Sequence, residues 1–393
     1  GYPATGVVDQ KWNQLTGRFA TNWTPKLDFT DQTLIYASYG HGYKAGGANP
    51  PGAALLTFGN VGISNPIHPL TFKPEFVDAY ELGTKNTLLD GGLTLNGDVF
   101  YYNYTGYQIS RIVDRTAIND NFNATVRGAE LEAMWEPVPG LKFNFAGGYE
   151  DTRIDNGQSS IDLMDRADVA NHPDWMVVKP FVTQSSNCIL PVSVVATIMK
   201  ARPPVSAGNG TSSIPGSCSN AYQSGLDPVT DEPYKANPVF PTDYRISLDM
   251  HDPGAYPGFD PTTAPNNGEG WAKNLGGNEL PNAPHFTTSL SADYTMPVSE
   301  DWAATLHSDF YWQSQSWARV FNDRPYDKLR GYSNVNLALI LTSAQGWQVM
   351  GYLKNVFDAT AITGDFLNSD DSGLTTNVFL TDPRLFGVRV TKN

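Results

Sequence analysis

The residues that could do chemistry are few in this chain of 393 residues. Its six histidines never form the His-Glu-x-x-His spacing that holds zinc on a helix. No Gly-x-Ser-x-Gly turn presents a serine nucleophile, and no glycine-rich loop ends in Gly-Lys-Ser/Thr. His307 and Asp309 share one face of a strand pattern, but no nucleophile accompanies them, so they are interpreted as polar groups that line a wall. The sequence therefore predicts no enzyme, no metal site and no cofactor.

Aromatic rings and carboxylates gather in one long, weakly periodic segment, residues 154–282. Rings flanked by carboxylates can stack on a sugar or an aromatic ligand, or bind a cation. The alternative is that the rings pack the small core of the segment itself, and both interpretations stay open. The nearby carboxylates include Asp162, Asp165 and Asp168. The rings considered as ligand contacts are Trp175, Tyr222, Tyr234, Tyr244 and Trp271.

The rest of the chain alternates apolar and polar residues with a period of two. In residues 93–99 the odd positions are apolar or Gly and the even positions are polar. This period is typical of strands with one apolar face. Helical patterns are nearly absent, and only residues 192–200 favour a short helix. We predict eleven strands, near 14–23, 33–43, 75–87, 92–105, 122–135, 141–153, 283–295, 302–314, 329–342, 346–357 and 384–393.

Short and long connections alternate strictly between these strands. The short ones contain Gly, Pro, Asp or Ser and are typical of turns, as in 88–91, 136–140, 297–300 and 343–345. The long ones lie near 44–74, 106–121, 154–282, 315–328 and 358–383. A soluble sandwich has no reason to place every long loop at one end. An outer-membrane barrel has one, because its short turns face the periplasm and its long loops face outward.

The composition of the chain and the residues at the ends of its apolar strand faces favour the barrel. The sequence contains no run of eighteen apolar residues, so it predicts no membrane-spanning helix. A net charge of −14 and a pI near 4.8 argue against nucleic acid as a partner. Charged residues almost never fall on the apolar faces, where Lys or Arg would cost roughly 2–4 kcal/mol at mid-membrane. The apolar stripes end in aromatic residues that could form interfacial girdles: Tyr101, Trp135, Tyr149, Tyr294, Trp302, Trp312 and Trp347.

Several stretches, in this order along the chain, resemble the TonB-dependent outer-membrane receptor family. They run from 34 to 47, 72 to 75, 79 to 85, 126 to 132, 353 to 358 and 383 to 390. The resemblance covers the chain from about residue 14 to its end. It implies a 22-stranded antiparallel up-and-down transmembrane β-barrel, of which eleven strands would be the C-terminal half. The plug domain that fills such barrels, and the box that pairs with TonB, have no counterpart in residues 1–393.

The resemblance also implies a function. It implies a receptor that takes up a scarce solute, a ferric siderophore or another large nutrient, with energy supplied through TonB and its inner-membrane motor complex. The alternatives are a receptor for a carbohydrate or aromatic compound, a passive porin-like channel, a barrel esterase, or a soluble adhesin-like β-protein. The expected location is the outer membrane, with extracellular long loops and a periplasmic C-terminus. The expected partners are TonB, membrane lipid and lipopolysaccharide, and a small-molecule or oligosaccharide ligand.

The two cysteines of the chain, Cys188 and Cys218, both lie in the long extracellular segment. Because a cell surface is oxidising, we expect a disulfide between them rather than two free thiols. Closing a loop of about thirty residues would stabilise the segment by roughly 3–4 kcal/mol.

Overall fold

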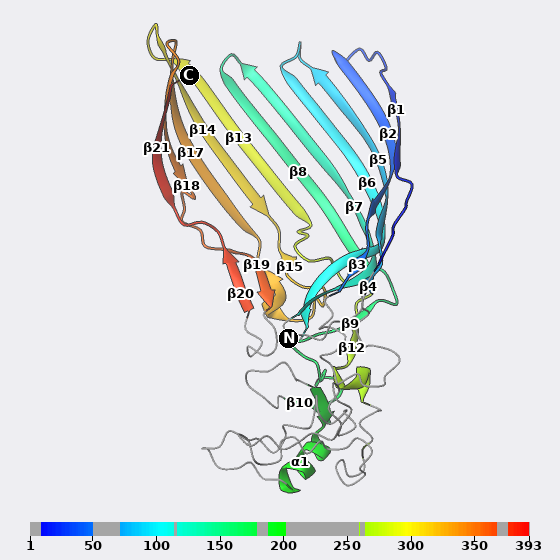
Figure 1. Ribbon diagram of the computed structural model, residues 1–393. Helices are drawn as coiled ribbons and strands as arrows, with labels where there is room; N and C mark the ends of the chain where they lie inside the picture. Colours follow the sequence, from blue (N-terminus) through cyan, green and yellow to red (C-terminus); the bar gives the residue numbers. More distant parts are fainter. Residues whose placement is uncertain are drawn as a thin grey trace.

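One antiparallel sheet of eleven strands dominates the computed structural model, which describes residues 9–49, 71–113, 116–178, 188–201, 259, 264–367 and 376–392. The sheet curves into an open half-barrel (Figure 1). All eleven expected strands are confirmed, and each pairs with the next one along the chain. In order they are β1 (Gly17–Trp23), β2 (Gln32–Lys44), β5 (Glu75–Leu88), β6 (Leu93–Val113), β7 (Thr116–Val138), β8 (Leu141–Ile154), β13 (Phe286–Pro297), β14 (Trp302–Gln313), β17 (Tyr332–Ser343), β18 (Trp347–Lys354) and β21 (Leu385–Lys392).

The two faces of the sheet differ in chemistry, as the alternation predicts. Leu82, Val99 and Leu131 are about half exposed, at 54%, 53% and 46%. Leu82 lies opposite Val99 in the register of β5 and β6, so the apolar stripe continues across the strands. We call this apolar surface the outer face. The inner face carries Glu81 and Glu130 at the alternating positions. A sheet with one apolar and one polar face fits a wall between lipid and a polar lumen.

Aromatic side chains mark both edges of the outer face. Near the long connections, the ring centroids of Tyr39 and Tyr80 lie 5.2 Å apart, and those of Tyr80 and Tyr101 lie 6.5 Å apart. Trp302 and Trp312 stand at opposite ends of β14, ten residues apart. At about 3.4 Å per residue and a tilt of about 40°, this separation spans roughly 26 Å. The value matches the apolar band of about 25 Å in outer-membrane barrels.

The β6–β7 hairpin is longer than the sequence indicates. A loop was expected over 106–121, but β6 continues to Val113 and β7 begins at Thr116. A bulge between Tyr104 and Tyr107 shifts the register. Gly106 makes the bulge possible, because its φ is +70° and a Cβ there would lie 2.6 Å from the carbonyl oxygen of Pro74. The expectation of a loop was wrong because the bulge breaks the period-two pattern without ending the strand.

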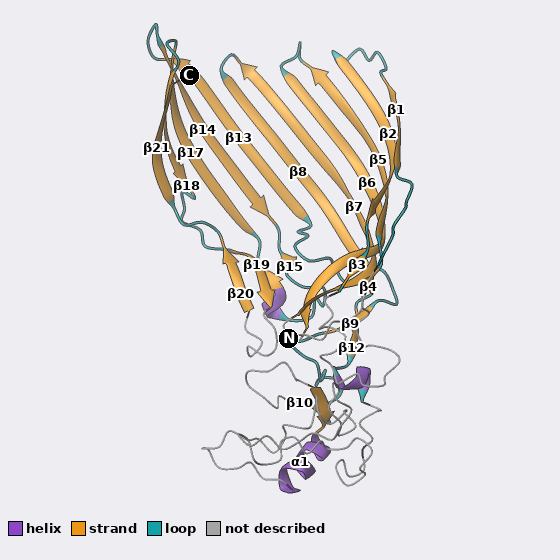
Figure 2. Ribbon diagram, viewed as in Figure 1, coloured by secondary structure: helices purple, strands orange, loops and turns teal. Residues whose placement is uncertain are grey.

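Shorter elements occupy the long connections, all at the end of the sheet opposite the short turns (Figure 1). One helix, α1 (Val192–Ala201), confirms the expected helical segment, and helices are rare throughout the described chain (Figure 2). No helix in the described ranges is long and apolar enough to cross a membrane. Five two-stranded ribbons pair β3 (Gly47–Ala48) with β4 (Thr71–Phe72), β9 (Ser159–Ile161) with β12 (Ala272–Asn274), β10 (Trp175–Val178) with β11 (Cys188–Pro191), β15 (Ser316–Trp317) with β16 (Lys328–Leu329), and β19 (Ile362–Leu367) with β20 (Thr376–Leu380).

The two faces can be tested by placing the same charge on adjacent residues. Leu131→Arg puts a guanidinium on the outer face, whereas Glu132→Arg puts one on the inner face. We expect Leu131→Arg to lower the free energy of unfolding by about 2–4 kcal/mol in lipid vesicles, because an arginine there must be desolvated. Glu132→Arg should change it by much less. Denaturant titration of the vesicle-inserted protein measures both, and equal losses would contradict the assignment of faces.

Candidate functional site

The long connections fold back over the inner face of the sheet and build a core there. Phe122, Ala124 and Val126 of β7 pack with Leu275 and Val320 from two different connections. Leu275 is completely buried. Burial of this kind stabilises a loop by about 25 cal/mol per Å² of apolar surface. The core therefore fixes the connections against the wall. We call this folded region the loop-end assembly, comprising the described parts of residues 154–178, 264–285 and 315–330 with β19 and β20.

Arg319 is the centre of the charged part of the assembly. Its Nε and Nη2 donate to the two carboxylate oxygens of Asp327, both at 2.8 Å, and its Nη1 donates to Asp162 at 2.6 Å. Asp162 and Asp327 are almost completely buried. Burial alone would lower the pKa of the Arg319 guanidinium, but the hydrogen bonds and charges of the two carboxylates raise it. Arg319 thus stays charged and links two connections.

A second cation, Lys273, ties β12 to Asp162 and to two further carboxylates. Its Nζ lies 3.0 Å from Asp165, 2.8 Å from Asp323 and 3.7 Å from Asp162. Arg324 also donates to Asp165. Burial would raise the pKa of the Asp165 carboxyl, but Lys273 and Arg324 lower it below its usual value. The ion pairs therefore continue from Arg319 across the whole assembly.

A third guanidinium joins the assembly to the extended β6–β7 hairpin. The Nε of Arg111 donates to Asp120 at 2.6 Å, and its Nη1 lies 3.4 Å from the buried carboxylate of Glu269. Arg111 lies on the inner face because the bulge at Gly106 shifts the alternation, so that the odd-numbered side chains after the bulge face inward. The hairpin and the 264–285 connection are thereby held together.

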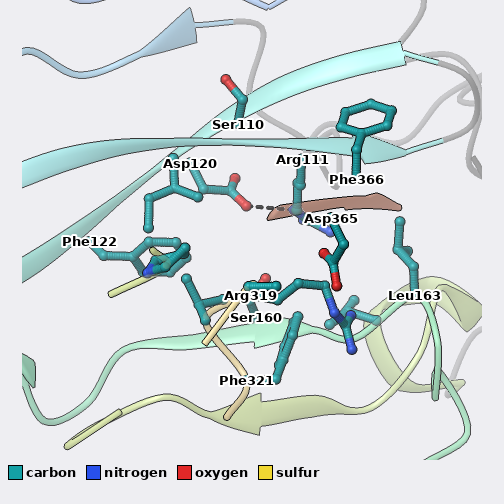
Figure 3. A pocket seen from close by; sticks show the side chains of 15 residues that line it. Ser110, Arg111, Asp120, Phe122, Ser160, Leu163, Arg319, Phe321, Asp365 and Phe366 are labelled. Carbon is teal, nitrogen blue, oxygen red and sulfur yellow. Dashed lines mark hydrogen bonds and ion pairs between the residues drawn. The ribbon is translucent and has the colours of Figure 1, made fainter. Parts of the chain in front are cut away.

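A cavity of about 200 Å³ lies between these groups (Figure 3). Its wall combines apolar side chains from β6, β7 and the connections, such as Ile109 and Phe122, with Arg111 and Arg319. Asp365 of β19 completes the wall, and its carboxylate points into the space beside Arg319 (Figure 3). Burial, followed by the charge of Asp327, raises the pKa of Asp365. Sequence reasoning missed this site, because its residues lie up to about 250 positions apart and none belongs to a local motif.

The rings named as ligand contacts are brought together in part. Trp175 and Trp271 meet edge to face, with ring centroids 5.7 Å apart at 85°. His172 stacks on Trp271 at 3.7 Å, and Phe259 meets the edge of Trp175 at 5.8 Å. Neither His172 nor Phe259 was expected from the sequence. These contacts favour packing among the rings, and ligand contact by them stays a prediction. Tyr222, Tyr234 and Tyr244 lie outside the described residues.

Cys188 begins β11, is completely buried and is disulfide-bonded. Cys218 lies outside the described residues, so the Cys188–Cys218 pairing stays a prediction. A disulfide at Cys188 would anchor the polypeptide that follows α1 to the β10–β11 ribbon.

His307 is held in a polar network on the inner face rather than in a reactive arrangement. Its Nδ1 lies 2.7 Å from Asp293 and its Nε2 lies 3.4 Å from Asp309. Asp309 in turn accepts a hydrogen bond from Asn336 at 2.8 Å. This geometry agrees with the interpretation of His307 and Asp309 as groups that line the wall. Among the residues that the structure describes, no group of three or more His, Cys, Asp or Glu side chains could hold a metal ion.

The meandering sheet, its aromatic-edged outer face and its inner loop-end assembly define part of a transmembrane receptor β-barrel. Residues 2–182 match the family model of the TonB dependent receptor-like β-barrel. This match identifies residues 2–182 as part of the β-barrel of a TonB-dependent receptor. The described eleven-stranded sheet as a whole has the fold of part of such a barrel. Comparison with curated protein sequences gives no match.

Solved structures with a similar fold are receptors and transporters. The ferric yersiniabactin uptake receptor FyuA from Yersinia pestis shares 14% identity with a TM-score of 0.52, and the alignment covers 96% of this chain and 37% of that one. The siderophore receptor PiuA from Acinetobacter baumannii shares 13% identity with a TM-score of 0.49, and the alignment covers 95% of this chain and 35% of that one. The copper transporter OprC shares 12% identity with a TM-score of 0.49, and the alignment covers 95% of this chain and 38% of that one. The chain thus spans less than two-fifths of the length of each of these structures.

Removal of Arg319 should loosen the loop-end assembly. Arg319→Met leaves Asp162 and Asp327 buried without their main partner, which costs about 3–5 kcal/mol for a buried pair. We expect faster amide hydrogen exchange in residues 159–167 and 316–329. Arg330→Met, which removes an exposed arginine of the same connection, is the matched control and should leave exchange unchanged. Unaltered exchange in Arg319→Met would show that the ion pairs do not hold the assembly.

The lowered pKa of Asp165 gives the assembly a defined response to acid. A carboxyl with a lower pKa in the folded state stabilises that state above its unfolded pKa, and this stabilisation is lost as pH falls through the folded value. We expect the stability difference between the natural protein and Asp165→Asn to be constant above about pH 5 and to shrink below pH 4. Protection of residues 159–167, measured by hydrogen exchange at several pH values, checks this. A difference that grows toward acid pH would contradict it.

Proposed function

We propose that the chain forms part of the wall of an outer-membrane active-transport receptor, which takes up a scarce solute with energy supplied through TonB. The observation that carries this proposal is the eleven-stranded antiparallel sheet, which is apolar and edged by aromatic residues on its outer face. Residues 2–182 of the chain match the barrel of TonB-dependent receptors. Such a wall performs no covalent chemistry. It supplies a passage, and the elements at its loop end supply selectivity.

The wall must be completed by further strands. In the described sheet, β1 and β21 are edge strands, each paired on one side only. An unpaired strand edge cannot face hydrocarbon, because each unsatisfied backbone group there costs several kcal/mol. We propose that other strands of the same receptor close the barrel and that a plug within it meets TonB. The polar inner face, with Glu81, Glu130 and the His307 network, would surround that plug.

The loop-end assembly favours a selective receptor over an open channel. The long connections pack on the inner face through Leu275, Leu280 and Val320 rather than standing away from the opening. We place this end outside the cell and the short turns in the periplasm, as in other barrels with one long-looped end. Lipopolysaccharide and membrane lipid would then surround the outer face between the two aromatic rows.

The solute is proposed at the level of class. A ferric siderophore or another large nutrient fits the family, and FyuA is named as an uptake receptor for ferric yersiniabactin. A carbohydrate or a neutral aromatic compound is the alternative, supported by the number of aromatic residues in the segment 154–282. The carboxylates of the long connection, in a chain of net charge −14, disfavour an anionic chelate and so support this alternative.

Uptake measurements in cells test the proposal. We expect cells that produce the receptor to accumulate one member of a panel of radiolabelled iron chelates and oligosaccharides, and to lose this accumulation when TonB is deleted. Loss follows because binding alone cannot concentrate a solute without energy. A strain that lacks the receptor is the control. Accumulation that persists without TonB would support a passive channel instead and would overturn the proposal.

A further inference from the structure

The charges around the cavity do not balance. Its two guanidinium groups are both committed to other carboxylates: Arg111 to Asp120 and Glu269, and Arg319 to Asp162 and Asp327. Lys273 also contacts Asp162, at 3.7 Å, so these four carboxylates already face three cations. Asp365 is a fifth carboxylate in the same wall. The cavity consequently carries an excess of negative charge that favours a cation.

Asp365 has no partner of its own among the described residues. Its Oδ1 is buried and receives no hydrogen bond, and no ion pair or hydrogen bond joins its side chain to another described group. Leaving a buried acceptor unpaired costs about 1–3 kcal/mol, and more when the group is charged. Burial and the charge of Asp327 raise the pKa of Asp365, and they outweigh the nearby charge of Arg319, which lowers it. A ligand that supplies a positive N–H group would remove this cost.

The size and the other walls of the cavity limit what that ligand group can be. A volume of about 200 Å³ is below the roughly 300–1,000 Å³ of pockets that enclose whole drug-sized ligands. Ile109, Phe122, Leu163, Val320 and Phe321 give an apolar surface beside the carboxylate. No cluster of three or more possible metal ligands exists in the described ranges. The combination fits a small organic group with an ammonium end and an apolar body.

We propose that this cavity, with Asp365 as its anion, is a binding site for a protonated primary amine attached to a small apolar or aromatic group. The ammonium donates to the free Oδ1 of Asp365, and the apolar part lies against Phe122 and Phe321. The site is separate from the Trp175–Trp271 ring cluster. Where the amine belongs to the transported solute, the inference rests on the proposed uptake function. A free amine that binds without transport has the same chemistry.

Binding of a simple probe tests the site directly. The probe is phenethylammonium, titrated by calorimetry into the purified detergent-solubilised protein, with neutral 2-phenylethanol as the matched ligand. We expect the ammonium to bind at least tenfold more tightly than the alcohol. Asp365→Asn should abolish this preference, because the amide cannot pair with a charge. Asp382→Asn, which removes an exposed carboxylate of the same connection, should retain it. Equal binding by the natural protein and Asp365→Asn would overturn the proposal.

Three further measurements distinguish failure of the amine site from failure of the uptake proposal. Affinity for the ammonium should fall as pH drops through the pKa of Asp365, and this pH dependence should be absent in Asp365→Asn. Asp365→Glu should restore part of the preference, and its absence there together with an intact melting temperature would count against a direct contact. Accumulation of labelled phenethylammonium by cells with TonB, but not without it, would identify the amine as part of a transported solute. Binding without accumulation supports a site for a free amine and leaves the uptake proposal to its own test.

Discussion

The backbone of a membrane wall has to hydrogen-bond to itself, because hydrocarbon offers it no partner. Eleven strands meet this constraint by pairing each with its sequence neighbour, from β1 to β21. Side chains are then free to differ between the faces, and they do so with a period of two. Leu82 and Val99 face outward as paired neighbours, while Glu81 and Glu130 face inward. The aromatic rows, the tilt and the inner polar networks all depend on this pairing.

A different physical problem is solved at the loop end, where water competes for every polar group. The connections bury Leu275 and Val320 against β7 and then join their charged groups in one network. Arg319 and Lys273 both contact Asp162, and Arg111 contacts Glu269, so each cation meets a carboxylate that is far from it in the sequence. Buried ion pairs add little net stability, but breaking one is costly. Such a network therefore selects one arrangement of the connections rather than adding to their stability.

Local patterning predicted the wall and could not predict the assembly. Period-two alternation and the helical pattern of residues 192–200 each lie within a few residues, so the eleven strands and the α1 helix could be predicted from them. Arg319 and Asp162 are 157 positions apart, and no local signal relates them. Trp175 and Trp271 were chosen for their aromatic character, which indicates burial but not a partner, and their edge-to-face contact depends on a ribbon far from the sheet. The extended β6–β7 hairpin was missed because one bulge changes the phase of the alternation.

That bulge also has a consequence for how the receptor can change over generations. Before Gly106 the odd-numbered side chains of β6 lie on the apolar outer face. After Gly106 the odd-numbered Tyr107, Ile109 and Arg111 lie on the inner face. Deleting one residue at the bulge would move the inward side chains between the bulge and the loop end to the outer face and the outward ones to the inner face. The part of β6 before the bulge would keep its two faces. A single insertion or deletion at this point thus changes which side chains of the hairpin face the loop-end assembly. The wall and the assembly can in this way diverge as separate modules within one continuous hairpin.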